Sequence, residues 1–404
     1  MLLTIVGLPA RGKSWTAKKI NAYFSWLGFK SRIFSFEDNR IPTPARRRLS
    51  SQDLSEGEIQ NPPNHQNEPE EIVNEEIKEH TNLIDNILGF FKIGGEIAIY
   101  IPWSTTHKKR VTLMSRVKSA DPSIDVLFLE NICNEAATLN LNIKNKIDTS
   151  THLKDMPKSE GVKYVQQRVK SYQRGFETIS DDSLSYIKII NMKSKMISNR
   201  VYGNLSTRVM SLVQSMHLEL RPLWLVRTED EADQERHQKF RLTLRKFIEK
   251  RIPTRTNELV IFSSMEATKT IEFMNIGTTV VSSVLSPLNT GTVPTYTTPN
   301  FSLRYPDVYN KFNANPINYR FPKGESFKDL IHRLEPYILQ LERYTVPVMV
   351  VAHDSVIKAL YSYFLKQRGL SLNPCSPNLL PSYTIVELAS THTGWTDKIF
   401  NLLN

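Results

Sequence analysis

Short apolar runs alternate along this chain with longer segments whose apolar residues recur at helical spacing. The run LLTIV at residues 2–6 predicts a buried strand. Apolar residues between Ala17 and Leu27 then fall on one face of a helix that begins near Lys13. The run SRIFSF at residues 31–36 predicts a second strand. The first part of the chain is therefore expected to fold as strand, loop, helix and strand.

The same alternation continues to the end of the chain. Helical periodicity covers residues 71–91 and 199–218, and further strands are predicted at 96–101, 125–130, 184–190, 223–227, 258–264, 346–353 and 384–389. Strands that alternate with helices favour an α/β fold with a parallel sheet and helices on both faces. A length of 404 residues suits two such domains, and Pro222 ends the long helix. We expect domains at residues 1–220 and 221–404.

One segment breaks the pattern. Residues 42–68 are rich in Pro, Ser, Asn and Glu and nearly free of large apolar side chains. Such a composition buries too little surface to offset the loss of chain entropy, so it predicts a disordered insertion. Its RRRLSS motif resembles a basophilic kinase target with Ser50 as the acceptor. A solvated basic cluster is the alternative interpretation.

Composition narrows the class of protein. The net charge of +11 suits an anionic ligand, but the basic residues are dispersed and no nucleic-acid recognition module is evident. The longest apolar run, residues 346–352, is too short to span a bilayer, and the N-terminal apolar stretch lacks the charged region of a secretory signal. Cys133 and Cys375 are expected to be reduced thiols. These features predict a cytoplasmic protein without membrane or nucleic-acid partners.

The clearest chemical motif is GLPARGKS, which follows the first predicted strand and opens the first predicted helix. Gly7, Gly12, Lys13 and Ser14 have the spacing of a phosphate-binding loop. The backbone N–H groups of such a loop, here including Ala10 and Arg11, bind phosphate at the start of the helix. Lys13 would reach the β- and γ-phosphates of ATP, and the Ser14 hydroxyl would hold Mg²⁺. The alternative is a glycine turn that matches the spacing by chance.

Longer stretches carry a family resemblance. GLPARGKS followed by AKKINAYFSWLGFKSR, LFLENICNE, FPKGESFKDLIHRLEPYILQLER and VVAHDSVIKALYSYFL resemble the bifunctional 6-phosphofructo-2-kinase/fructose-2,6-bisphosphatase family. The resemblance covers most of the chain in the family's order. It implies a P-loop kinase domain followed by a histidine-phosphatase domain of the phosphoglycerate-mutase type. It also implies ATP, fructose 6-phosphate and fructose 2,6-bisphosphate as ligands, and a homodimer.

In the kinase half, the resemblance implies substrate contacts at several positions. Lys146 in NIKNKI matches a lysine that touches the substrates, with a catalytic role. Arg168 and Tyr172 in QRVKSYQRGF match the sugar-phosphate stretch, in which an arginine grips phosphate through two hydrogen bonds. Arg40 and Thr105 match two further substrate-binding positions. Taken without the resemblance, Lys146 and Arg168 would be interpreted as solvated charges on helix faces.

The kinase half also departs from the family pattern. The carboxylate expected at the end of the strand at 96–101 is replaced by Ile101, and a following threonine by Trp103. An isoleucine can neither orient Mg²⁺ nor accept a proton from the attacking hydroxyl. Glu130, at the end of the next strand, is the candidate substitute. An ordinary carboxylate at a strand end is the alternative for Glu130.

The phosphatase half has lost its expected centre. Arg227 is present, but the nucleophilic histidine of the family is Thr228 and the following glycine is Glu229. Threonine without a base is a poor nucleophile, so bisphosphatase activity is expected to be absent. The remnants of the phosphatase site are Arg227, Arg320, Lys323, Glu325 and His353.

Two hypotheses remain open. The first is a 6-phosphofructo-2-kinase without bisphosphatase activity. The second is a pseudoenzyme that binds nucleotide or sugar phosphate and regulates without catalysis.

Overall fold

The computed structural model describes two compact units. Residues 1–21 and 29–214 form the first unit, and residues 22–28 and 215–404 form the second. The described residues are 1–36, 70–102, 106–150, 153, 156–193, 195–217, 219–229, 233–252, 259–272, 274, 276–296, 300–370, 375, 380–391 and 394–403. The predicted insertion at 42–68, including Ser50, lies outside these ranges.

The first unit is built on a six-stranded sheet with the order β2-β3-β1-β4-β5-β6. Its strands are β1 (Leu2–Val6), β2 (Ser31–Ser35), β3 (Ile97–Ile101), β4 (Val126–Ile132), β5 (Tyr186–Ile190) and β6 (Lys195–Asn199). The first five are parallel, and β1 lies between β3 and β4. The antiparallel β6 departs from the prediction. Only a short 3₁₀ turn, η2 (Asn191–Lys193), precedes β6, and so short a connection cannot make a parallel crossover.

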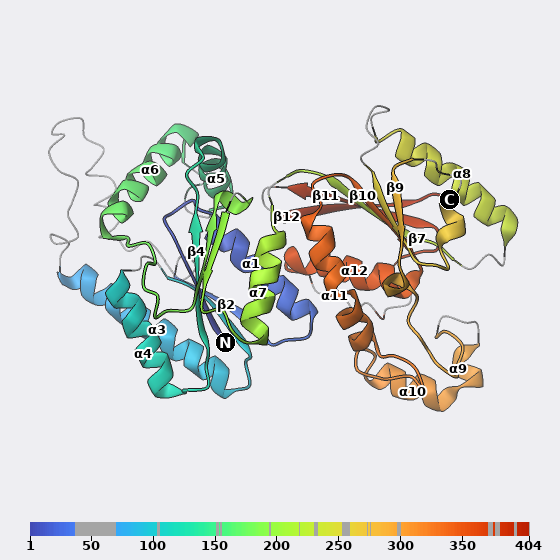
Figure 1. The fold of residues 1–404 in the computed structure, drawn as a ribbon, viewed down its shortest axis with the longest axis horizontal. Helices are drawn as coiled ribbons and strands as arrows, with labels where there is room; N and C mark the ends of the chain where they lie inside the picture. The colour runs from blue at the N-terminus through green and yellow to red at the C-terminus, as the bar shows by residue number, and fades with distance from the viewer. Residues whose placement is uncertain are drawn as a thin grey trace. The chain divides into compact units, whose positions relative to one another are not determined.

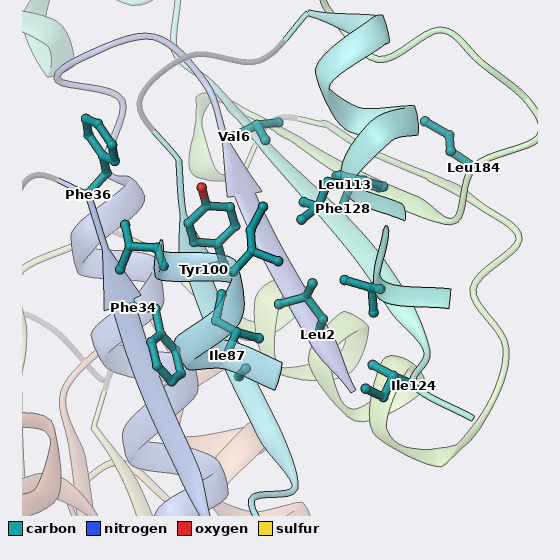
Figure 2. Packing of buried hydrophobic residues seen from close by; sticks show 14 of the residues in the cluster. Leu2, Val6, Phe34, Phe36, Ile87, Tyr100, Leu113, Ile124, Phe128 and Leu184 are labelled. Atoms are coloured by element: carbon teal, nitrogen blue, oxygen red, sulfur yellow. The ribbon is translucent and has the colours of Figure 1, made fainter. Parts of the chain in front are cut away.

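Helices surround this sheet (Figure 1). They are α1 (Lys13–Trp26), α3 (Glu70–Lys92), α4 (His107–Ala120), α5 (Ala136–Thr149), α6 (Lys158–Gly175) and α7 (Asn204–Ser215). Figure 2 shows the core on one sheet face, where Leu2 and Val6 of β1 meet Ile87 of α3 and Leu113 of α4. The alternate strand residue Ile5 is fully buried as well, so both faces of the central strand are covered.

The second unit has its own six-stranded sheet, ordered β12-β11-β7-β10-β8-β9. Its strands are β7 (Pro222–Arg227), β8 (Val260–Ser263), β9 (Thr278–Val281), β10 (Val348–Ala352), β11 (Thr384–Thr391) and β12 (Gly394–Asn401). Strands β7 to β10 are parallel. Strand β11 runs antiparallel to β7 and pairs with β12 through a close connection, which adds an antiparallel edge to the predicted sheet.

The helices of the second unit complete its core. They are α8 (Gln234–Glu249), α9 (Phe301–Arg304), α10 (Pro306–Ala314), α11 (Phe327–Arg343) and α12 (Asp354–Gln367), with short 3₁₀ turns η3 (Thr268–Thr270) and η4 (Ser283–Leu285). Helix α12 packs against β7 and β10, and nearly all of its residues are buried. A separate apolar cluster joins Phe240 and Leu244 of α8 to Trp224 and Val226 of β7. In the part of the chain that the structure describes, no helix has the length and apolarity needed to cross a membrane.

Candidate functional site

The loop between β1 and α1 adopts a backbone conformation that glycine allows. Gly7 has φ of +140° and Gly12 has φ of +79°, and Ala10 between them is also left-handed at +58°. A Cβ on Gly7 would lie 2.5 Å from the carbonyl oxygen of Asn131. The absence of a side chain at residue 7 therefore lets the loop lie directly against the end of β4.

Two asparagine side chains hold this loop in place. Asn131 of β4 donates through Nδ2 to Thr16 Oγ1 at 2.8 Å and to the carbonyl of Arg11 at 3.3 Å. Asn142 of α5 donates through Nδ2 to the carbonyl of Ala10 at 3.1 Å. Neither asparagine was predicted as a site residue, because an asparagine that supports a loop from a distant segment has no local signature in the sequence.

Lys13 begins α1 and bends back over the loop. Its side chain is buried, and Nζ donates to the carbonyls of Gly7 at 2.8 Å and Leu8 at 3.0 Å. Ser14, the next residue in the first turn, is exposed. Burial lowers the pKa of Arg11, whose Nη1 donates to Pro9 O at 3.2 Å. Two cationic side chains and the N-terminus of α1 thus lie on one short segment. This arrangement favours the binding of an anion.

Helix α5 brings the predicted Lys146 to this loop's side of the unit. Ala10 packs with Ile143 and Ile147 of α5, and Asn142 on the same helix contacts the loop backbone. Lys146 follows Asn142 by four residues, so the two share one helix face. Lys146 is half-buried there. The predicted contact of Lys146 with the substrates stays a prediction.

Helix α6 carries the next two predicted residues and packs against α5. Arg168 and Tyr172 are one turn apart, with the guanidinium carbon 5.6 Å from the centre of the tyrosine ring. Tyr172 is buried and Arg168 half-buried. The structure thus brings these two predicted residues together on the layer that also holds Lys146.

The end of β3 lacks the carboxylate that the family resemblance leads one to expect. Ile101 is buried at 3% exposure and pairs in register with Ser35 of β2. Thr106 caps α4, accepting from the N–H of Lys109 at 3.3 Å. Arg40, Trp103 and Thr105 lie outside the described residues.

Glu130 is buried and its two oxygens are engaged within the protein. The Thr178 hydroxyl donates to Oε1 at 2.8 Å and to Oε2 at 3.1 Å, and the N–H of Ile179 donates to Oε2 at 3.0 Å. The ammonium of Lys188 lies 3.7 Å from Oε2. These contacts anchor the segment that follows α6, which is the role of a structural carboxylate. A catalytic role for Glu130 stays a prediction.

The second unit places Arg227 at the carboxyl end of β7. Its guanidinium contacts Glu229 Oε1 through Nε at 2.7 Å and through Nη2 at 2.6 Å. Thr228 is buried, and its hydroxyl lies 2.9 Å from the hydroxyl of Thr270. The residue that replaces the expected nucleophile is therefore held in a hydroxyl pair.

A second carboxylate completes this centre from the start of α12. Asp354 Oδ1 lies 2.8 Å from Arg227 Nη1, and Asp354 Oδ2 accepts from the fully buried Lys358 at 2.8 Å and from Tyr296 at 3.2 Å. Burial lowers the pKa of Lys358, and Asp354 opposes that change. Burial also raises the pKa of Tyr296, and Asp354 adds to the increase. We call Arg227, Glu229, Asp354 and Lys358 the charge quartet.

The other predicted remnants have different partners. Arg320 pairs with Asp329 at 2.6 Å, and Glu325 accepts from Arg333 at 3.0 Å. Lys323 is exposed, and His353 is half-buried at the N-cap of α12. Arg320 and Glu325 thus stabilise the segment before α11 and the helix itself.

Known protein families match the sequence of each unit. The 6-phosphofructo-2-kinase family matches residues 1–219, and branch 1 of the histidine phosphatase superfamily matches residues 224–401. Among solved structures, that of Bacillus stearothermophilus YhfR aligns at 17% identity and a TM-score of 0.37, over 46% of this chain and 100% of that one. The two family matches show a kinase unit followed by a histidine-phosphatase unit. The chain belongs to the 6-phosphofructo-2-kinase family.

Curated relatives carry related names. A 6-phosphofructo-2-kinase/fructose-2,6-bisphosphatase of Arabidopsis thaliana is 27% identical over 100% of this chain and 54% of its own length. The rat 6-phosphofructo-2-kinase/fructose-2,6-bisphosphatase 3 is 25% identical over 97% of this chain and 70% of its own length. The 6-phosphofructo-2-kinase 1 of Saccharomyces cerevisiae is 25% identical over 90% and 48%. The chain therefore spans about half the length of the plant and yeast relatives.

Proposed function

We propose that this chain is an ATP-dependent 6-phosphofructo-2-kinase that converts fructose 6-phosphate to fructose 2,6-bisphosphate and lacks bisphosphatase activity. The observation that carries the proposal is the loop at residues 7–12, with Lys13 at its end and two asparagines that fix its backbone. Family membership supports the reaction. The kinase part is taken as residues 1–220 and the phosphatase-like part as 221–404.

Each residue has a role in this proposal that follows from its position. The loop amides and Lys13 bind the β- and γ-phosphates of ATP. Bound Mg²⁺ would neutralise charge on the transferred group, and the exposed hydroxyl of Ser14 fits a ligand for it. Lys146 adds positive charge beside the loop, and Arg168 grips the sugar phosphate.

The proposed kinase works without the usual carboxylate at the end of β3. Ile101 offers no proton acceptor, and the oxygens of Glu130 are engaged by Thr178 and Ile179. General-base assistance typically contributes about 10²–10⁴-fold to a rate. Phosphoryl transfer otherwise depends on positioning and charge neutralisation, so we expect a slow enzyme.

The presence of Ile101 in place of a carboxylate specifically favours a second candidate function. In that alternative the chain binds nucleotide or sugar phosphate and regulates a partner without catalysis. A cytoplasmic location, a homodimer and phosphorylation at Ser50 by a regulatory protein kinase are further proposals that either function accommodates.

One assay separates the two candidates. Purified protein is incubated with Mg-ATP and fructose 6-phosphate, and fructose 2,6-bisphosphate is measured, with Lys13→Met as the control and ATP binding followed by calorimetry. Product that disappears in Lys13→Met supports the kinase. ATP binding without product supports the regulator. Absence of binding of both ATP and fructose 6-phosphate at millimolar concentration overturns both proposals.

A further inference from the structure

Helix α8 lies at the outside of the second unit (Figure 1), and a groove of about 450 Å³ separates part of it from the segment that begins at η3. The described residues that line this groove include His237, Arg241 and Leu242 of α8 and Lys269 and Glu272 of the facing segment. His237 forms the floor, since it is only 5% exposed and its ring centre lies 6.2 Å from that of the buried Tyr383. We call this feature the α8 groove.

The α8 groove and the helix beside it carry an excess of positive charge. Arg241 and Lys269 line the groove together with one carboxylate, that of Glu272. Over its whole length α8 holds five basic residues and two acidic ones. One of the two acids, Glu249, is already paired with Arg245 at 2.8 Å. The surface therefore attracts a partner that carries negative charge.

The shape of the groove favours an extended partner over a small molecule. Among the described residues that line it, only His237 is buried, Arg241 is half-buried, and the others are exposed. A small-molecule site encloses most of the surface of its ligand, which so open a groove does not do. The lining residues of α8 extend from Gln234 to Leu242, over about two turns of helix, and a short peptide strand fits along that length.

The other groups of the groove suit a peptide better than a nucleic acid. The side-chain amides of Gln234 and Gln238 can hydrogen-bond to a peptide backbone. Leu242 is 55% exposed, so a partner with an apolar side chain gains by covering it. Among the described lining residues there is no Phe, Tyr or Trp on which a base could stack. The carboxylate of Glu272 would repel a continuous row of phosphates, whereas a peptide can place a neutral residue beside it.

We propose that the α8 groove binds an acidic peptide segment of a partner protein, with carboxylates beside Arg241 and Lys269 and an apolar side chain over Leu242. This inference is independent of the kinase proposal. It also involves none of the predicted remnants of the phosphatase site. Attraction between exposed charges mainly speeds association and is screened by salt, so the interaction is weak and sensitive to ionic strength.

The test is a fluorescence anisotropy titration of the full chain with a short fluorescein-labelled polyglutamate peptide that carries a single leucine. Lys269→Glu and Arg241→Gln are compared with the wild type. Lys239→Glu is the matched control, because Lys239 is an exposed residue of α8 that does not line the groove and its substitution changes the net charge as Lys269→Glu does. We expect each groove variant to bind about tenfold more weakly than the wild type, and the control to change by less than about twofold. A peptide with glycine in place of leucine should bind about threefold more weakly to the wild type.

Four results would overturn the proposal. The first is the absence of peptide binding by the wild type at low salt. The second is unchanged binding by Lys269→Glu, whose substitution at an exposed residue leaves the fold intact by circular dichroism and thermal melting. The third is an equal loss in Lys239→Glu, which would show attraction to the net charge of the chain rather than to the groove. The fourth is tighter binding of a labelled oligouridylate of the same charge, which would assign this surface to nucleic acid.

Discussion

Each unit places a lysine on a helix that follows a central strand, and the two lysines have contrasting surroundings. Lys13 of the first unit donates to two backbone carbonyls of its own loop. Lys358 of the second unit is fully buried and donates to the carboxylate of Asp354. The Lys13 ammonium contacts neutral carbonyl groups. The Lys358 ammonium belongs to the charge quartet, in which two cations are balanced by two carboxylates.

The difference has a consequence for ligand binding. A carbonyl that accepts a hydrogen bond from an ammonium is readily replaced by a phosphate oxygen, because the new contact is between opposite charges. A buried carboxylate is replaced only if it leaves or is neutralised. The loop of the first unit is thus prepared for an anion, whereas the charge quartet of the second unit supplies its own. Similar residue types at similar places in two sheets therefore do not imply similar activity.

The largest expected effects come from making the same substitution in both units. Lys358→Met removes one of the two cations that contact the buried carboxylate of Asp354. We therefore expect the free energy of unfolding to fall by about 3 kcal/mol. Lys13→Met removes the hydrogen bonds to the carbonyls of Gly7 and Leu8, and we expect a loss of about 1 kcal/mol. ATP affinity should fall about 100-fold in Lys13→Met, since charge-assisted bonds to phosphate are lost. Urea unfolding and calorimetry measure these quantities.

Exchanged effects of the two substitutions would contradict the contrast between Lys13 and Lys358. A Lys358→Met protein as stable as the wild type would show that the quartet does not depend on its buried cation. A Lys13→Met protein that binds ATP normally would show that the loop backbone alone carries the affinity.

Most of the fold follows from local sequence pattern. The run LLTIV became β1 at residues 2–6, and the predicted strand at 384–389 became β11 at 384–391. Strand β6 was missed because KMISN at residues 195–199 is short and lies at an edge, where only some side chains face the core. Strands β9 and β12 are also edges of their sheet. Hydrophobic periodicity is weak at such places, so pairing cannot be inferred from it.

The candidate site was predictable only in part. The motif from Gly7 to Ser14 is a contiguous signal, and it identified the loop directly. The supports of the loop, Asn131 and Asn142, are more than 100 residues away and form only on folding. The pairing of Arg227 with Glu229 and Asp354 likewise depends on side-chain geometry, although the added negative charge of Glu229 is visible in the sequence.

A smaller effect is expected from Gly7→Ala. The new Cβ would meet the carbonyl oxygen of Asn131 at 2.5 Å, at a φ of +140° that side chains rarely adopt. We expect a loss of about 2 kcal/mol in stability and of about tenfold in ATP affinity, because the loop must move away from β4. Gly94→Ala is the control, since its φ of +85° is also strained but its nearest contact is the flexible end of Lys30 at 3.6 Å. Equal loss of ATP affinity in both variants would contradict this account.

The smallest expected effect tests whether the loop needs its distant support. Asn131→Ala removes the hydrogen bonds to Thr16 and to the carbonyl of Arg11, so we expect a loss of about 1 kcal/mol in stability and about fivefold in ATP affinity. Asn199→Ala in β6 is the matched control, because its side chain also donates two hydrogen bonds, to the carbonyls of Asp182 and Leu184. Both variants should be similarly destabilised, and only Asn131→Ala should weaken ATP binding by calorimetry. An equal weakening in Asn199→Ala would mean that affinity follows the stability of the unit rather than the shape of the loop.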